Sequence, residues 1–216
     1  MVFKRRTPRT WLQVFVQAFY PKGGWRRAVE YVVHRLRRLP DPPHKIARGV
    51  AAGVFVSFTP FFGFHFVFAA IIALMMQGNI LAALLATFFG NPITFPLIAA
   101  INLELGNWML DMPDSVPLQH VFSEFSRASV ELWHNATAMF TDDTAHWDSL
   151  RHFFWRVAWP YTVGGLIPGT IAGVIAYMLT LPAVSAYQKR RVKKMKERFE
   201  KRKLALQRAD VSIKAD

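Results

Sequence analysis

The stretch GVAAGVFVSFTPFFG, residues 49–63, opens a run of 55 residues, from Gly49 to Leu103, that contains no Asp, Glu, Lys or Arg. A second uncharged run of 32 residues extends from Val157 to Gln188. Because a helix rises about 1.5 Å per residue, 55 helical residues would reach about 80 Å, whereas the hydrocarbon core of a bilayer is about 30 Å thick. The first run must therefore turn back at least once. The sequence predicts an all-α, polytopic integral membrane protein.

The charges outside these runs predict a topology. Residues 1–48 carry 12 Lys and Arg against 2 acids, residues 188–216 carry 12 against 4, and the residues between carry 3 against 8. Because cytoplasmic flanks of membrane spans are enriched in Lys and Arg, we expect both termini in the cytoplasm and the acidic segment 111–152 outside. The net charge of +13 is then explained by anionic lipid headgroups as partners, and no nucleic acid is expected.

This topology requires an odd number of crossings before residue 111. Two full spans, 49–76 and 79–110, would leave the acidic segment inside, so one of them must be re-entrant. The first is the better candidate, because TPFFG at residues 59–63 divides it into halves of a dozen or so residues, each too short to span.

Three breaks rich in glycine and proline interrupt the uncharged runs. Irregular backbone at membrane depth survives only where it is buried in protein or lines a wet cavity. Arg48 precedes the first break, and Arg156 the third, by the same interval of twelve residues, and matching interrupted segments in two halves indicate a transporter built from inverted repeats. The residues that mark the breaks are Pro60 and Gly63, Pro92 and Pro96, and Pro168 and Gly169.

Four ionisable residues are candidates for substrate binding. Arg48 and Arg156 would converge on one phosphate, which the planar guanidinium fork suits; alternatively, each only anchors its segment at a boundary. His65 and Glu104 are expensive at membrane depth, which makes a functional role the default hypothesis. The structural alternatives are a hydrogen-bonded packing role for His65 and a solvated position at the outer interface for Glu104.

Two polar residues, Asn91 and Thr94, complete the candidate set. They belong to the second break, GNPITFP at residues 90–96. A ligand role and satisfaction of the backbone opened by Pro92 and Pro96 are equally good interpretations.

Amphipathic segments flank the membrane region. Residues 25–39 predict an interfacial helix with an apolar face surrounded by arginines, the alternative being a solvated basic linker helix. The outer segment predicts a second amphipathic helix, and the tail after Gln188 a third, suited to membrane-surface contact or weak self-association into a homo-oligomer. The three stripes are Trp25, Val29, Val32, Leu36 and Leu39; Val121, Phe125, Ala128, Leu132, Ala136 and Met139; and Val192, Met195, Phe199 and Leu206.

Several other classes are not expected. There are no cysteines, and no two of the outer histidines have the spacing that places two metal ligands on one helix face. No nucleophile–base pair or phosphate loop is present, so we expect no enzyme, metal or cofactor. The apolar stretch Trp11–Tyr20 lacks a cleavage pattern and is not expected to be a signal peptide.

The stretch from YPKGGWRRAVEYVVHRLRRLPDPPHKIARGVAAGVFVSFTPFFGFHF through GNILAALLATFFGNPITFP to INLELGNWML closely resembles the domain-of-unknown-function family numbered 2062, in its proteobacterial form. That family looks like a distant branch of the DedA superfamily, whose members carry re-entrant hairpins and include candidate lipid-carrier transporters. The resemblance covers roughly residues 20–187. It implies a bacterial inner-membrane location and transport of an anionic lipid, although the acidic proton-coupling residues of the better-studied branch have no matching motif here.

The leading hypothesis is a transporter or flippase of an anionic lipid or lipid-linked carrier. The alternative is a non-enzymatic membrane scaffold that recruits envelope-assembly enzymes through its basic termini. The expected organisation is a cytoplasmic basic segment 1–45, a membrane region 46–110 with the re-entrant hairpin, an acidic periplasmic loop 111–152, a broken membrane segment 153–187 and a basic cytoplasmic helical tail 188–216.

Overall fold

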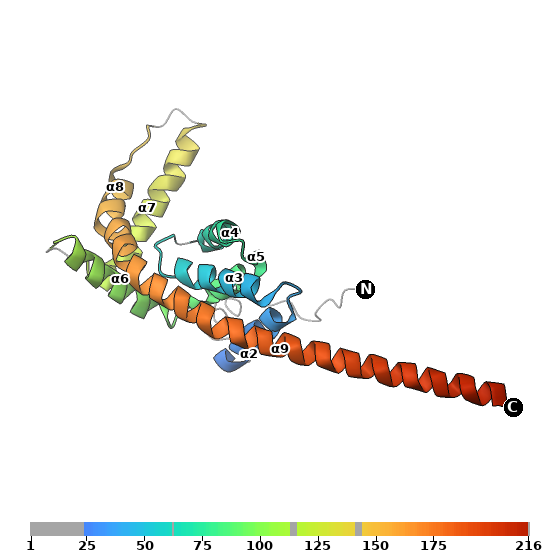
Figure 1. The fold of residues 1–216 in the computed structure, drawn as a ribbon. Coiled ribbons are helices and arrows are strands. Elements are labelled where there is room, and N and C mark those ends of the chain that lie inside the picture. Colours follow the sequence, from blue (N-terminus) through green and yellow to red (C-terminus); the bar gives the residue numbers. More distant parts are fainter. Residues whose placement is uncertain (1–23, 62, 113–115, 141–143, 216) are drawn as a thin grey trace.

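The computed structural model describes residues 24–61, 63–112, 116–140 and 144–215, and the regular elements in these ranges are all helices. The expectation for Trp11–Tyr20 lies outside the described residues. The elements are α2 (Gly24–Arg38), α3 (Pro43–Val56), α4 (His65–Met75), α5 (Ile80–Ala86) with the 3-10 turn η1 (Thr87–Phe89), α6 (Phe95–Met109), α7 (Leu118–Ala138), α8 (Asp148–Phe153), the π-helical η2 (Phe154–Ala158) and α9 (Trp159–Ala215) (Figure 1).

The helices α3, α4 and α5 run back and forth beside one another. They have 14, 11 and 7 residues, so each is too short to cross a hydrocarbon core. The backbone amide of Asn79 donates to the carbonyl of Lys45 (2.8 Å), and Arg48 Nη1 donates to the carbonyl of Met76 (3.1 Å). The turn between α4 and α5 therefore lies beside the start of α3. The predicted turn-back at residues 59–63 is confirmed as a hairpin of α3 and α4.

Glycines let α5 approach α3 closely. A Cβ added to Gly49 would lie 2.2 Å from the carbonyl oxygen of Asn79, and one added to Gly53 would lie 2.2 Å from that of Ala83. The two glycines form a GxxxG motif, a pattern that membrane helices use for close backbone packing. No larger residue fits at either position without separating the two helices.

The long helix α9 is the axis of the molecule (Figure 1). Early in α9, a Cβ on Gly164 would lie 1.9 Å from the carbonyl oxygen of Asn102 in α6. Two and a half turns later, a Cβ on Gly173 would lie 3.2 Å from the carbonyl oxygen of Ala51 in α3. The helices α6 and α3 thus pack against successive parts of α9, and α9 runs antiparallel to both.

The predicted break at Pro168 and Gly169 is wrong. α9 is continuous from Trp159 to Ala215, with Pro168 inside it. Gly165, Gly169 and Gly173 recur every four residues and face α3, so the glycines serve helix packing rather than a break. The predicted broken segment 153–187 is instead a helix whose one irregular part is the π-helical η2, around Arg156.

The amphipathic predictions for the flanking helices are confirmed in part. α2 forms, and Leu36 and Leu39 pack against the core. α7 forms as well, with Val121 and Ala128 buried. The second half of its predicted stripe is wrong, because polar side chains of α7 face the segment before α8 there. The predicted stripe residues that are exposed instead are Leu132, Ala136 and Met139.

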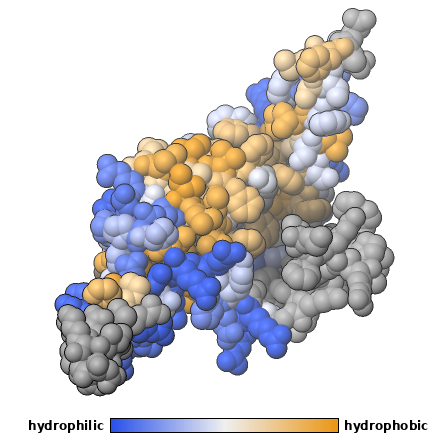
Figure 2. Space-filling view, turned by 90° about the vertical axis from the view of Figure 1, so that its right-hand side faces the viewer, coloured by the Kyte–Doolittle hydropathy of each residue, from blue (hydrophilic) through white to orange (hydrophobic). Residues whose placement is uncertain are grey.

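Within the described residues, one helix is long and apolar enough to cross a membrane, Asp148–Lys201. Only 17% of its most apolar stretch is buried, whereas the core helix of a soluble protein is mostly buried. Large apolar side chains are also exposed on α4 and α6, among them Leu74 (60%) and Leu97 (64%). Hydrophobic residues accordingly cover a broad central face, with hydrophilic residues at its margins (Figure 2).

Candidate functional site

The two breaks in the first uncharged run lie next to each other, and we name them together the central junction (residues 57–61, 63–65 and 87–94). Ser57 Oγ donates to the carbonyl of Thr87 (3.3 Å), and the Phe58 and Phe89 rings stack with centroids 5.9 Å apart. The junction forms because α3 and α5 run parallel and end at the same level. Two interruptions 30 residues apart in sequence thereby become one region in space.

At the first break, side chains satisfy the carbonyls released by the end of α3. Asn102 Nδ2, from α6, donates to the Phe58 carbonyl at 2.8 Å. His65 Nε2 lies 3.3 Å from the Thr59 carbonyl oxygen. The Asn102 side chain is fully buried. This geometry favours the packing interpretation of His65, which is half-buried at the first residue of α4.

At the second break, the polar residues bond to the local backbone. Asn91 Oδ1 accepts from the amides of Ile93 (2.9 Å) and Thr94 (3.2 Å). Thr94 Oγ1 donates to the Phe89 carbonyl at 2.5 Å. Of the two interpretations left open by the sequence, this geometry supports satisfaction of the opened backbone.

The outer side of the central junction is exposed. Phe64 is 61% exposed and Ile93 63%. Gly63 has φ +85° with no atom within 4 Å of an added Cβ, a backbone conformation that favours glycine. The junction therefore presents irregular backbone at the molecular surface.

The predicted convergence of Arg48 and Arg156 is wrong. Ala51, one turn after Arg48, faces Gly173, which lies 17 residues along α9 from Arg156; that separation is about 25 Å along the helix. Arg48 donates to the Met76 carbonyl instead, and Arg156 lies in η2. The equal spacing to a proline does not bring them together, because α3 and α9 run antiparallel.

The structure therefore gathers three of the six predicted site residues, His65, Asn91 and Thr94, at the central junction. Glu104 is exposed on α6, whereas Asn102 and Gly106 on the same helix are buried against α9. Sequence reasoning missed Asn102. Its signal was available, since it is one of the few amide side chains in the uncharged run.

Sequence reasoning also missed a polar tie at the opposite end of α3. Asn79 Nδ2 donates to Asp41 Oδ2, and Asn79 Oδ1 caps α5 by accepting from the amide of Ala82 (2.6 Å). Gln188 Nε2 donates to the Asp41 carbonyl at 2.9 Å. The chain before α3, the turn before α5 and the last uncharged turn of α9 are thereby held together.

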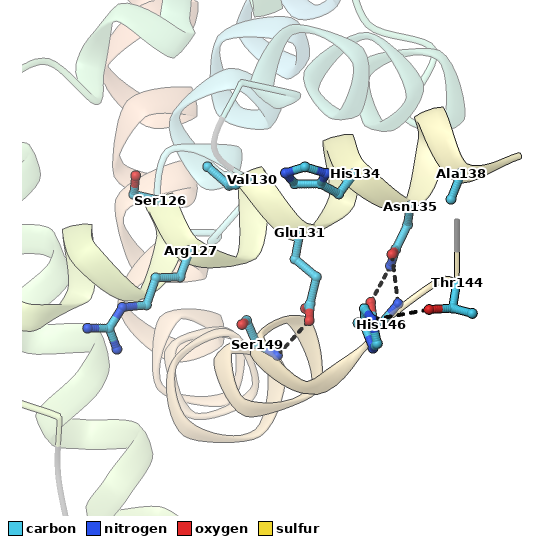
Figure 3. A pocket seen from close by; sticks show the side chains of 10 residues that line it. All are labelled: Ser126, Arg127, Val130, Glu131, His134, Asn135, Ala138, Thr144, His146 and Ser149. Carbon is cyan, nitrogen blue, oxygen red and sulfur yellow. Dashed lines mark hydrogen bonds between the residues drawn. The ribbon is translucent and has the colours of Figure 1, made fainter. Parts of the chain in front are cut away.

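A second polar region lies between α7 and the segment that leads into α8 (Figure 3). It borders an open hollow of about 710 Å³. The Glu131 carboxylate accepts from the amides of Ser149 (3.1 Å) and Leu150, and so caps α8 from a neighbouring helix. Asn135 accepts from the amide of His146 (2.9 Å) and donates to its carbonyl. Its polar groups thus fasten α7 to α8, and among the described residues no group of acids and histidines is arranged to hold a metal ion.

Replacing Glu131 by alanine is expected to loosen α8. The loss of a capping carboxylate costs about 1 kcal/mol, which corresponds to roughly fivefold faster hydrogen exchange of the amides of residues 149–153. Glu131→Gln, which keeps one acceptor oxygen, should have a smaller effect. Exchange measured by mass spectrometry checks this, and unchanged rates in Glu131→Ala would show that the cap does not hold α8.

The fold defines an all-helical protein with at least one helix able to span a membrane and a broad apolar surface. The chain belongs to the family described as "Uncharacterized protein conserved in bacteria (DUF2062)", whose model matches residues 26–193. No curated protein and no solved structure matches the chain.

Proposed function

We propose that the chain is a multi-pass protein of the bacterial inner membrane with both termini in the cytoplasm. α3 enters from the cytoplasmic side, α4 and α5 form a re-entrant pair, and α6 completes the crossing begun by α3. α9 returns the chain to the cytoplasm. This arrangement explains how the two uncharged runs give two net crossings, and it agrees with the distribution of Lys and Arg.

We further propose that this protein moves an anionic lipid or lipid-linked carrier across the membrane. The observation that carries the proposal is the exposed irregular backbone of the central junction. Gly165 and Gly169, which pack against Phe58, lie about 15 to 20 Å along the helix from Arg156 and so well inside the bilayer. Backbone of this kind cannot face hydrocarbon, and a water-lined groove satisfies it.

The polar headgroup would pass along this groove while the acyl chains stay in the bilayer. The arginines of α2, together with Lys45 and Arg48, would raise the concentration of anionic headgroups at the cytoplasmic mouth. The resemblance to the DedA superfamily, which includes candidate lipid-carrier transporters, supports the same function. The arginines have no shared headgroup site in this version of the proposal.

Single cysteines in the cysteine-free chain test the groove. Phe64→Cys lies on the central junction, whereas Leu166→Cys lies on α9 beside Gly165, which packs against Phe58 of the junction. In proteoliposomes, a water-soluble maleimide should modify Phe64→Cys at least tenfold faster than Leu166→Cys, because thiolates form in water and not in hydrocarbon. Equally slow labelling of both would contradict a wet groove.

The transport step is measured in the same proteoliposomes. The unmodified chain should move a fluorescent anionic lipid between leaflets faster than protein-free vesicles do, and maleimide attached at Phe64→Cys should slow it. Translocation at the protein-free rate, by chain that labels as expected and is correctly inserted, would overturn the transport proposal.

One observation favours the scaffold alternative. Beyond Gln188, α9 continues for 27 residues to Ala215 and extends away from the other helices (Figure 1). A rigid basic helix of this length would reach about 40 Å into the cytoplasm. A scaffold would need this extension and tolerate changes at the central junction.

A further inference from the structure

The extension of α9 has an apolar stripe that no part of the described chain covers. Gln188, which bonds to Asp41, is the last residue of α9 with a printed contact to the body. Beyond it, Val192 is 46% exposed, Met195 53% and Phe199 71%. The three residues lie on one side of the helix, at three- and four-residue spacing.

The charges beside the stripe have one sign. When Val192 and Met195 are taken as positions a and d of a heptad, Phe199 is the next a position. The flanking e and g positions, which set partner choice in paired helices, are then all basic. These residues are Arg191, Lys196, Arg198 and Lys203, whereas Glu197 and Glu200 fall outside the a, d, e and g positions.

We propose that the α9 extension, residues 189–203, docks an acidic amphipathic helix of a partner protein. An apolar stripe flanked by Asp or Glu would complement both the apolar and the basic positions of this surface. The inference names a partner class for the scaffold alternative, and it rests on the membrane topology but not on lipid transport.

Two other occupants fit this surface less well. In a parallel pair of two copies, position g of one helix faces position e of the other, so Arg191 would face Lys196 and Arg198 would face Lys203. Like charges there oppose pairing. The cytoplasmic membrane surface is anionic, but the extension continues the spanning helix straight out of the bilayer and carries Phe199 about 15 Å beyond Gln188.

The test uses the full chain in nanodiscs of uncharged lipid. The probe is a fluorescent helical peptide with Leu at positions a and d and Glu at e and g, measured by anisotropy at 150 mM salt. We expect saturable binding that weakens at least tenfold in the triple variant Val192→Ser, Met195→Ser and Phe199→Ser. A probe with Ser at a and d should bind correspondingly weakly to the unaltered chain.

A matched pair of charge variants separates docking from general attraction between charges. Lys196→Glu with Arg198→Glu reverses e and g positions and should abolish binding, and a probe with Lys at e and g should bind this variant. Lys193→Glu with Lys194→Glu makes the same change in net charge at positions b and c and should lose less than threefold. Equal losses in the two variants would overturn the proposal, as would stripe-dependent dimers of the chain or tighter binding to anionic vesicles than to the probe.

Discussion

Gly165→Ala is expected to lower the free energy of unfolding by about 3 kcal/mol, a fall in melting temperature of roughly 10 °C for a chain of this size. A Cβ at this position would lie 2.2 Å from the carbonyl oxygen of Phe58 and 2.9 Å from Asn102 Nδ2. The first of these atoms is backbone, so relief requires α9 and the end of α3 to move apart. Such a movement would also loosen the central junction.

Two variants of the same helix control this measurement. At Gly173, a Cβ would lie 3.2 Å from the Ala51 carbonyl oxygen, so a shift of a few tenths of an ångström suffices and Gly173→Ala should cost less than half as much. Thr170→Ala changes an exposed residue and should be close to neutral. Intrinsic tryptophan fluorescence during heating in detergent gives the three values, and equal stability of Gly165→Ala and Thr170→Ala would refute the close packing described for α3 and α9.

The hairpin of α3 and α4 could be predicted from sequence because it depends on length and charge. A run of 55 uncharged residues cannot be one span, and the odd crossing number that the acidic segment requires leaves few arrangements. TPFFG at residues 59–63 also has a proline where a buried helix would need an amide. These constraints are local or global, and they need no knowledge of which helices touch.

The third break and the paired arginines could not be predicted because they depend on contacts. Gly165 and Gly169 read equally well as a break and as a packing motif, and only the position of α3 distinguishes the two. The four-residue spacing that continues to Gly173 was the available signal for packing. The arginines failed for a related reason, since the relative direction of α3 and α9 decides whether equal spacing from a break brings residues together or apart.

The polar contacts of the central junction divide in the same way. Asn91 and Thr94 bond within their own turn, so the backbone role was open to prediction from the neighbouring prolines. Asn102 bonds to a carbonyl 44 residues away, a contact that only the stacking of α6 beyond α3 creates.

Asn102→Leu is accordingly expected to destabilise the protein by about 2 kcal/mol, because the buried Phe58 carbonyl would lose its donor while the side-chain volume changes little. Asn107→Leu is the matched control on the same helix. Asn107 Nδ2 is buried with no hydrogen-bond partner, so its replacement by an apolar side chain removes an unsatisfied group and should be neutral or stabilising. Both effects can be read from thermal unfolding in detergent. If the two variants lost the same stability, the Asn102 contact would be no more than the filling of space, and the end of α3 would have to be held by the glycine packing of α9 alone.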